Sequence, residues 1–163
     1  MIRAGILTAS DKGSKGERVD ESGKVIEELL ERIEAKVVSY SVVPDERTVI
    51  SAKLEEMADE MGVDLILTTG GTGFSPRDIT PEATLDVIER QIPGIPEAIR
   101  QKSLEVTNRA MLSRAVAGIR KKTIIINLPG SPKGVRECLE VVLPVLPHAI
   151  EILKGEAGEC ARG

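Results

Sequence analysis

The stretch TIIINLPGSPKG, residues 123–134, holds the pattern that decides the fold. Its first part, TIIINL, is almost entirely β-branched or aliphatic, which suits a strand covered by other structure on both faces. The turn PGSPKG follows, and a helical pattern begins near Gly134. A buried strand that leads into a helix is the unit from which α/β proteins are built, so this segment favours that fold class if the pattern recurs.

Short β-branched runs alternate with helical patterns over the rest of the chain. Strands are predicted over residues 2–8, 35–43 and 64–69, with a shorter one over residues 113–119. Because only three residues separate this last run from TIIINL, the two can pair only as an antiparallel hairpin. The predicted fold class is therefore α/β with a mostly parallel, mixed sheet.

Helix signals follow each of the first three strands. One helix begins near Glu21, where apolar residues recur at three- and four-residue steps. The next is predicted over residues 47–61, with Asp45 placed near its start as a candidate N-cap. A third begins at Thr80, whose hydroxyl is a candidate cap, and Pro81 suits its first position. Two more helices are predicted over residues 95–106 and 134–153, the latter kinked by its prolines.

Composition and charge exclude several classes of protein. The 163 residues suit one domain, predicted to span residues 1–155 and to be followed by a short polar tail over residues 156–163. The net charge of −4 and an aromatic content limited to Tyr40 and Phe74 argue against nucleic acid and anionic membranes as partners. The first apolar run is too short for a signal peptide or a membrane span, so we expect a cytoplasmic protein.

Polar loops follow the predicted strands. In open α/β sheets, ligands bind outside the carboxyl ends of the strands, and the parallel strands place those ends on one edge. The loops expected there cover residues 10–23, 44–46, 70–78 and 129–134. Ser10 and Asp11 open the first of these loops and are candidates for polar ligand contacts, with a simple turn as the alternative.

The turn Gly70-Gly71-Thr72-Gly73 is the sharpest of these signals. Its three glycines allow positive φ and let backbone N–H groups point at an anion, which predicts a phosphate cradle. A glycine-rich turn without a ligand is the alternative. The chain lacks G-x-x-x-x-G-K-[ST], and its first strand is not followed by G-x-G-x-x-G, so P-loop NTPases and dinucleotide dehydrogenases are disfavoured.

Charged side chains flank these turns. Asp45 and Asp78 end separate post-strand loops and could share a Mg²⁺ ion with phosphate oxygens, or each could merely cap a helix. Arg77 could bind phosphate through its planar fork or be an exposed charge. Ser131 and Lys133 stand at the start of the last helix, where free N–H groups attract anions; a plain serine cap is the alternative.

Motifs spread over almost the whole chain are more specific together than any one of them. They are SD at residues 10–11, PDE at 44–46, TTGGTGFSPRDITPEAT at 68–84, LSRAVAGIR at 112–120 and IINLPGSPKG at 125–134. In this combination the chain resembles the MogA/MoaB family of molybdenum-cofactor proteins, whose domain also occurs in gephyrin and plant homologues. The resemblance implies an α/β/α sandwich that binds molybdopterin and, in the transferase branch, adenylylates it with ATP and Mg²⁺ and releases pyrophosphate.

The resemblance also implies roles for particular residues. Asp45 and Asp78 would be the catalytic carboxylates and the Mg²⁺ ligands. The residues expected to bind the phosphates and the rest of the ligands are Ser10, Asp11, Gly70, Gly71, Thr72, Gly73, Arg77, Gly130, Ser131 and Lys133.

Two other functions stay open at this point. The chain has the shorter length of MoaB-like members, and a carrier that binds molybdopterin without transferring a group is one alternative. The other is nucleotide pyrophosphate hydrolysis, as in the similar competence-damage proteins, although no second domain accompanies this one. The family resemblance further implies a homo-oligomer, either a trimer or a hexamer, and a molybdate-insertion protein as a candidate partner.

Overall fold

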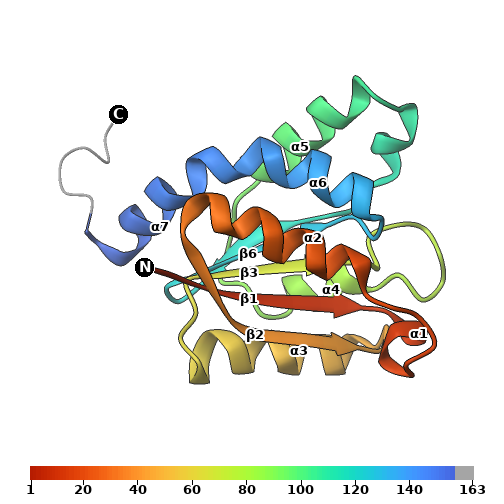
Figure 1. Ribbon diagram of the computed structural model, residues 1–163, viewed down its shortest axis with the longest axis horizontal. Helices are drawn as coiled ribbons and strands as arrows, with labels where there is room; N and C mark the ends of the chain where they lie inside the picture. Colours follow the sequence, from red (N-terminus) through yellow and green to blue (C-terminus); the bar gives the residue numbers. More distant parts are fainter. Residues whose placement is uncertain (157–163) are drawn as a thin grey trace.

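The computed structural model describes residues 1–156 and contains a six-stranded sheet between two layers of helices (Figure 1). The strands are β1 (Ile2–Ala9), β2 (Ala35–Val43), β3 (Leu65–Thr69), β4 (Arg90–Gln91), β5 (Ala117–Arg120) and β6 (Thr123–Leu128). The α-helices are α1 (Asp11–Ser14), α2 (Glu21–Leu30), α3 (Arg47–Glu55), α4 (Thr80–Leu85), α5 (Gly94–Leu104), α6 (Pro132–Val142) and α7 (Leu146–Lys154). Shorter helical segments are η1 (Glu31–Ile33), η2 (Glu56–Glu60), η3 (Asn108–Leu112) and η4 (Leu143–Val145).

The strand order β2-β1-β3-β6-β5-β4 confirms the predicted mixed sheet. β2, β1, β3 and β6 are parallel, whereas β5 pairs antiparallel with β6, and β4 antiparallel with β5. The arrowheads of β1, β2 and β3 point to the same side of the molecule, where α1 and the loop before α4 also lie (Figure 1). All four parallel strands therefore deliver their following loops to one edge of the sheet.

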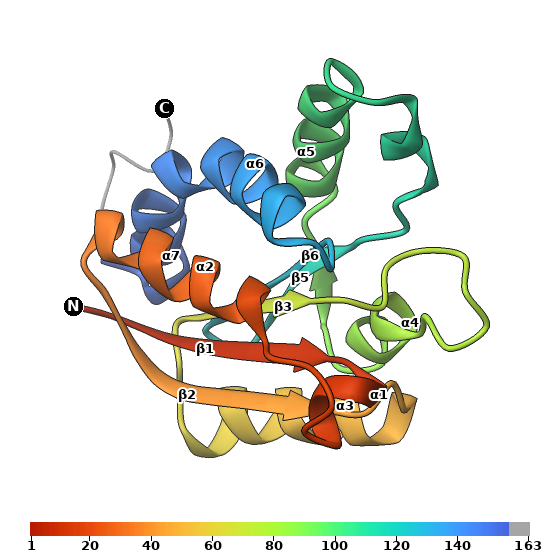
Figure 2. The same ribbon diagram turned by 45° about the vertical axis from the view of Figure 1, so that its right-hand side comes forward.

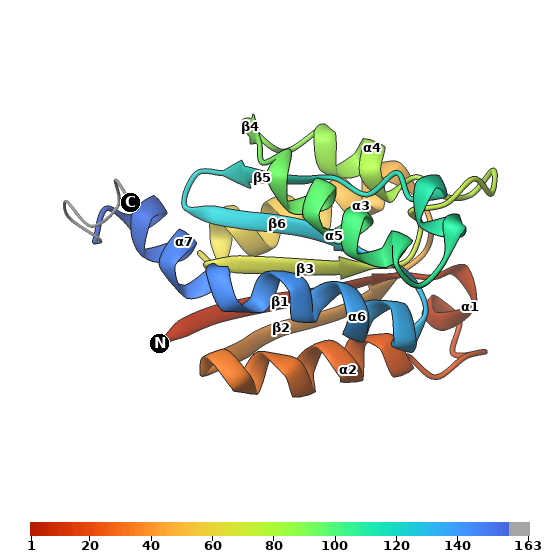
Figure 3. The same ribbon diagram turned by 90° about the horizontal axis from the view of Figure 1, so that it is seen from above.

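Helices cover both faces of this sheet, which confirms the three-layer arrangement. α2, α5, α6 and α7 lie over one face and α3 and α4 over the other (Figure 3). Alternate side chains of the strands serve the two layers, as the two-residue period of a strand requires. On β6, for example, Ile124 and Ile126 pack in the first core, and Ile125 packs in the second. Within residues 1–156, no helix combines the length and apolar character needed to cross a membrane.

Some element boundaries differ from the prediction. The predicted strand over residues 113–119 starts only at Ala117, because the N–H of Arg114 donates to the Thr72 carbonyl in another loop instead of to a strand. β4 was missed, since its two residues carry no β pattern. The helix predicted to reach residue 61 ends its regular part at Glu55 and finishes as a π-helical turn. The last helix is broken into α6, η4 and α7 at its prolines, as predicted.

Two capping predictions were wrong. Glu46, and not Asp45, is the N-cap residue of α3, and its side chain makes no capping hydrogen bond. Thr80 lies inside α4, whose N-cap residue is Ile79. The Thr80 hydroxyl is fully buried and has no hydrogen-bond partner, while its backbone N–H donates to the Gly71 carbonyl. Most of the predicted tail, residues 157–163, lies outside the described part of the chain.

A buried asparagine on β6 joins three elements next to the loop-bearing edge. The Asn127 side-chain amide donates to the hydroxyls of Thr68 and Thr84, at 3.0 Å each. Its carbonyl oxygen accepts from the N–H of Val116, at 3.1 Å. Because all of its polar atoms are engaged and the side chain is 1% exposed, Asn127 fixes β3, α4 and the start of β5 against β6.

We predict that Asn127→Ala lowers the free energy of unfolding by about 2–4 kcal/mol, because it leaves buried donors and acceptors without partners. Urea denaturation followed by circular dichroism measures the change. Asn108→Ala removes the same side chain from an exposed position and should change stability by less than about 0.5 kcal/mol. Equal effects of the two substitutions would show that the Asn127 network does not hold these elements together.

Candidate functional site

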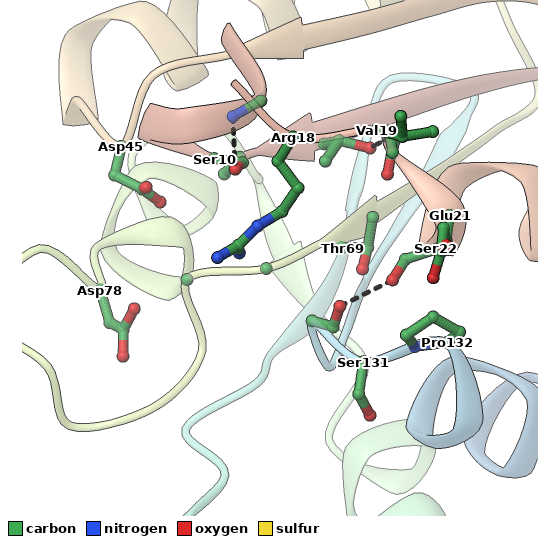
Figure 4. Close-up of a pocket in the computed structure, with 17 residues that line it drawn as sticks. Ser10, Arg18, Val19, Glu21, Ser22, Asp45, Thr69, Asp78, Ser131 and Pro132 are labelled. Carbon is green, nitrogen blue, oxygen red and sulfur yellow. Dashed lines mark hydrogen bonds between the residues drawn. The ribbon is translucent and has the colours of Figure 1, made fainter. Parts of the chain in front are cut away.

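A cleft with a volume of about 720 Å³ lies at the carboxyl ends of the parallel strands. Its walls come from the end of β1 and the loop after it, from Asp45 after β2, from the glycine turn after β3 and from the turn between β6 and α6. These four segments meet at one edge in the view of Figure 2 and surround the cleft in Figure 4. The four loops that sequence placed on a common edge thus form one concave surface.

The predicted site residues divide into three groups. Those that line the cleft are Ser10, Asp45, Gly70, Gly71, Asp78, Gly130 and Ser131. Thr72 and Gly73 instead line a neighbouring, more apolar depression of about 420 Å³. Asp11, Arg77 and Lys133 line neither cavity. Geometry thus brings together seven of the predicted residues, and the roles of all twelve as ligand contacts stay predictions.

The floor of the cleft is a pair of glycines with left-handed backbones. Gly70 has φ 92° and Gly71 φ 70°. A Cβ on Gly70 would stand 2.4 Å from the Ala9 carbonyl oxygen, and one on Gly71 would stand 2.3 Å from the Thr80 hydroxyl. Conformation and space both require glycine here, and the resulting bare backbone can approach an anion closely.

Hydrogen bonds tie the loops after β1, β2 and β3 to one another. The N–H of Asp11 donates to the Asp45 carboxylate at 3.0 Å, and the N–H of Asp45 donates to the Asp11 carboxylate at 2.9 Å. Arg77 adds a two-pronged ion pair to Asp11, at 2.9 and 3.0 Å, and this pairing lowers the pKa of Asp11 to about 2. Arg77 is therefore paired with Asp11 at the surface, and its role as a phosphate ligand stays a prediction.

The two candidate catalytic carboxylates share the cleft without capping helices. Burial raises the pKa of Asp45, and the charges of Asp11 and Asp78 raise it further, against the lowering effect of the Asp11 N–H and of Arg77. The Asp78 carboxylate accepts the N–H of Ser75 at 3.0 Å and so closes its own loop. Asp45 and Asp78 are thus two acidic groups that face a common space (Figure 4), and the surroundings of Asp45 disfavour its charged form.

A divalent cation fits this pair of carboxylates. Within residues 1–156, no group of three or more metal-ligating side chains comes together. Mg²⁺ does not need such a cage, because it commonly binds one or two carboxylates and completes its shell with water and substrate phosphates. The raised pKa of Asp45 marks negative charge that a cation would stabilise. Asp45 and Asp78 are therefore the residues that could hold Mg²⁺ here.

Arg114 braces the loop that carries Asp78. Its side chain donates to the carbonyl oxygens of Gly73 at 2.8 Å and of Asp78 at 2.9 Å, and it forms an ion pair with Glu82 at 2.6 Å. Three donors of one planar guanidinium thus fix both ends of the loop and the first turn of α4. The loop after β3 is therefore anchored by a residue in the segment before β5, since Gly73 and Arg114 are 41 positions apart in the chain.

The segment before α2 and the first turn of that helix supply cleft residues that sequence reasoning missed, chief among them Arg18, Asp20 and Ser22. Asp20 caps α2 and accepts hydrogen bonds from the hydroxyls of Thr8 and Tyr40. Ser22 donates to the Gly130 carbonyl at 2.6 Å, across the cleft wall (Figure 4). The unusual length of the loop over residues 10–23 was the one signal that could have pointed to them.

The fold and the cleft together define a class: α/β/α sandwiches with an anion-suited cleft at the carboxyl edge of a mostly parallel sheet. Residues 5–148 match the family described as a probable molybdopterin binding domain, and the chain belongs to this family. The resemblance found in the motifs is thereby confirmed.

Individual relatives extend over nearly the whole chain. A molybdopterin adenylyltransferase of Helicobacter pylori is 48% identical over 156 residues, which cover 94% of this chain and 89% of the relative. Gephyrin of Dictyostelium discoideum is 44% identical over 93% of this chain, which corresponds to 22% of gephyrin. The crystal structure of the molybdopterin biosynthesis enzyme MoaB from Thermus thermophilus matches with a TM-score of 0.90 at 54% identity, covering 95% of this chain and 98% of that one.

We predict that Gly70→Ala lowers the free energy of unfolding by about 3 kcal/mol or more, because the new Cβ collides with the Ala9 carbonyl and the backbone has positive φ. Gly62→Ala is the matched control, since Gly62 also has positive φ but open space around it. It should cost only the strain of the left-handed backbone, about 1–2 kcal/mol. Urea denaturation of both variants measures the difference, and equal losses would contradict the close approach of Gly70 to β1.

A second prediction concerns the charge of Asp45 in metal-free protein. Its pKa lies above the ordinary 3.8 in the folded state, so the stability present at low pH is partly lost as pH rises through the folded pKa. Asp45→Asn removes this cost and keeps an oxygen to accept the Asp11 N–H. We expect the variant to equal or exceed the parent in free energy of unfolding at pH 7 in EDTA.

This advantage should disappear as the pH is lowered below 3.8, where the aspartate is neutral. Asp86→Asn is the control, and its stability at pH 7 should change in the opposite direction. Arg47 lowers the pKa of that exposed carboxyl, so the charged form of Asp86 stabilises the fold. A clear loss of stability in Asp45→Asn at pH 7 would show that the charge of the partly buried Asp45 does not oppose folding.

Proposed function

We propose that this protein is a molybdopterin adenylyltransferase that uses ATP and Mg²⁺. One observation carries the proposal: Asp45 and Asp78 face the same cleft, whose floor is the Gly70-Gly71 turn. The name of the Helicobacter pylori relatives, molybdopterin adenylyltransferase, supports the same activity. In this proposal residues 1–155 act as a single molybdopterin-binding domain.

The reaction demands little covalent chemistry from the protein. An oxygen of the molybdopterin phosphate forms a bond to the α-phosphorus of ATP, and the bond from that phosphorus to the oxygen bridging to the β-phosphorus breaks. The products are adenylyl-molybdopterin and pyrophosphate. The attacking phosphate is already an anion, so no base is needed, and the enzyme acts by positioning and by charge neutralisation. Mg²⁺, when bound, would supply much of that neutralisation.

The chain's own residues suit the positioning role. Ser10 and Ser131 each accept a backbone N–H on Oγ, from Gly13 and Gly134 respectively, which leaves each hydroxyl hydrogen free to donate. Ser131 also caps α6, so the positive end of that helix points into the cleft. Together with the N–H groups of the glycine turn, these donors offer anion contacts on several sides of the cleft.

A carrier that binds molybdopterin without transfer is the second candidate. The observation behind it is the MoaB-like length: the match to MoaB of Thermus thermophilus covers 95% of this chain and 98% of that one. Both functions need the same cleft. They differ only in whether bound ATP and molybdopterin react.

We also propose that the protein is a homo-oligomer, a trimer or a hexamer, that passes its product to a molybdate-insertion protein. Support comes from exposed apolar side chains: Phe74 and Leu112 line the depression next to the cleft, and Val106 and Met111 are also exposed. Light scattering coupled to size exclusion chromatography distinguishes these assemblies from a monomer.

The adenylylation assay tests the leading proposal. Purified protein incubated with molybdopterin, ATP and Mg²⁺ should yield adenylyl-molybdopterin and pyrophosphate. Asp45→Asn and Asp78→Asn should each lower kcat by about 100-fold or more, because each removes charge that fixes the cation and the phosphates. Asp86→Asn, which makes the same substitution outside the cleft, should retain the parent rate.

The outcomes separate the candidates. Tight molybdopterin binding by folded protein without any adenylyl product would identify a carrier. Nucleotide hydrolysis that proceeds without molybdopterin would identify a pyrophosphate hydrolase instead. Parent-like rates in both Asp45→Asn and Asp78→Asn would remove these carboxylates from the chemistry.

A further inference from the structure

The charges that line the cleft pose a problem for a polyphosphate ligand. Its lining residues, all in the described part of the chain, include four carboxylates, those of Asp20, Glu21, Asp45 and Asp78. Arg18 is the only cationic side chain among them. A nucleotide triphosphate would add about four negative charges to this surface, so cationic groups within reach of the phosphates must decide whether it binds.

Three other cations near the cleft lie outside its lining, and two of them are held in short ion pairs. Arg77 holds Asp11 with two hydrogen bonds. The Arg114 guanidinium donates to the backbone carbonyls of Gly73 and Asp78 and to the Glu82 carboxylate. Lys133 is 81% exposed, outside the cleft lining and 3.9 Å from Glu137. Arg18 therefore lies in the cleft where Arg77 and Lys133 were expected to meet the phosphates.

The position of Arg18 suits a phosphate ligand. In Figure 4 its guanidinium extends into the space between Asp45 and Asp78, over the chain of the glycine turn. No hydrogen bond joins it to the other cleft residues drawn there, although two carboxylates flank the same space. Among the described residues that line the cleft, none therefore takes up the donors of this guanidinium.

The backbone on either side of Arg18 is anchored. The N–H of Glu17 donates to the Lys12 carbonyl at 2.9 Å, and Asp20 is fixed by Thr8, Tyr40 and its capping bond to Gly23. Only Arg18 and Val19 lie between these two anchors. The base of the arginine is thereby held at the cleft wall, while its long side chain keeps the freedom to close on a ligand.

We propose that Arg18 binds the β- and γ-phosphates of the nucleotide and stabilises the charge that develops on the departing pyrophosphate. This inference rests on the proposed function. When the bond from the α-phosphorus to the bridging oxygen breaks, its electron pair stays on that oxygen, and the pyrophosphate gains negative charge. A planar guanidinium binds two phosphate oxygens at once and cannot lose its proton, so it suits that task better than a lysine.

Binding measurements test Arg18 without relying on turnover. Isothermal titration calorimetry with magnesium pyrophosphate, Mg·ATP and AMP is compared for the parent, Arg18→Gln, Arg18→Lys and Lys15→Gln. Lys15→Gln is the matched control, because it removes one positive charge from the same loop but lies outside the cleft lining. Arg18→Gln should weaken pyrophosphate and ATP binding about 10- to 100-fold and AMP binding less than about twofold.

Arg18→Lys should recover only part of this affinity, since it keeps the charge but loses the planar fork. In the adenylylation assay, Arg18→Gln should lower kcat as well as raise the KM for ATP, because charge on the leaving group grows towards the transition state. A substitution that only disturbed the loop would weaken AMP as much as ATP.

Two results would overturn the inference: parent-like binding of pyrophosphate by Arg18→Gln, or equal losses of affinity for ATP and AMP. Failure of the proposed function looks different. If the parent protein binds ATP and pyrophosphate through Arg18 but makes no adenylyl product, Arg18 is still a phosphate ligand and the proposed transfer activity is refuted. If Arg18→Gln transfers adenylyl groups as fast as the parent, the proposed function stands and only the role of Arg18 is refuted. A parent that binds neither nucleotide nor pyrophosphate removes the inference entirely.

Discussion

The exchange of hydrogen bonds between Asp11 and Asp45 is the interaction on which the cleft depends. Each residue donates its N–H to the carboxylate of the other, so the loops after β1 and β2 are joined at the place where their strands end. Arg77 brings the loop after β3 to the same point by pairing with Asp11. Parallel pairing aligns the strand ends, but these charged contacts turn three separate loops into one wall with a defined position for Asp45.

This arrangement explains why the cleft is acidic although its ligands are expected to be anions. The cations near the edge are used to hold loops: Arg77 on Asp11, and Arg114 on the loop that ends at Asp78. The carboxylates left facing the cavity can bind phosphate only through a divalent cation, and Arg18 is the one cationic side chain in the cleft lining that the structure describes. Binding of the nucleotide would then require Mg²⁺. The same ion would neutralise the charge that develops on the phosphates during phosphoryl transfer.

The fold could be read from local patterns, whereas the partners of the site residues could not. Runs such as TIIINL predict buried parallel strands, and parallel strands end on one edge, so the loops on the carboxyl edge were identified correctly, although the strand order was not predicted. Which arginine faces the cavity is a different kind of question. Arg77 adjoins Asp78 in sequence but pairs with Asp11, 66 positions away, and Arg18 sits in a loop without a motif. Asp45 likewise has the sequence position of a cap, and only its contact with Asp11 shows that it is not one.

Several features that oppose stability gather at this same edge. Gly70 and Gly71 hold left-handed backbones, Asp45 carries a charge that its surroundings disfavour, and the buried Thr80 hydroxyl next to Gly71 has no partner, at a cost of about 1–3 kcal/mol for such a group. The cores on both faces of the sheet show no comparable compromise, being built of well-buried aliphatic side chains. Local features that work against folding persist where the surrounding structure enforces them and where a ligand can relieve them. Their proximity to the glycine turn agrees with the position of the cleft at this edge, although left-handed backbones also occur at Glu34 and Lys121.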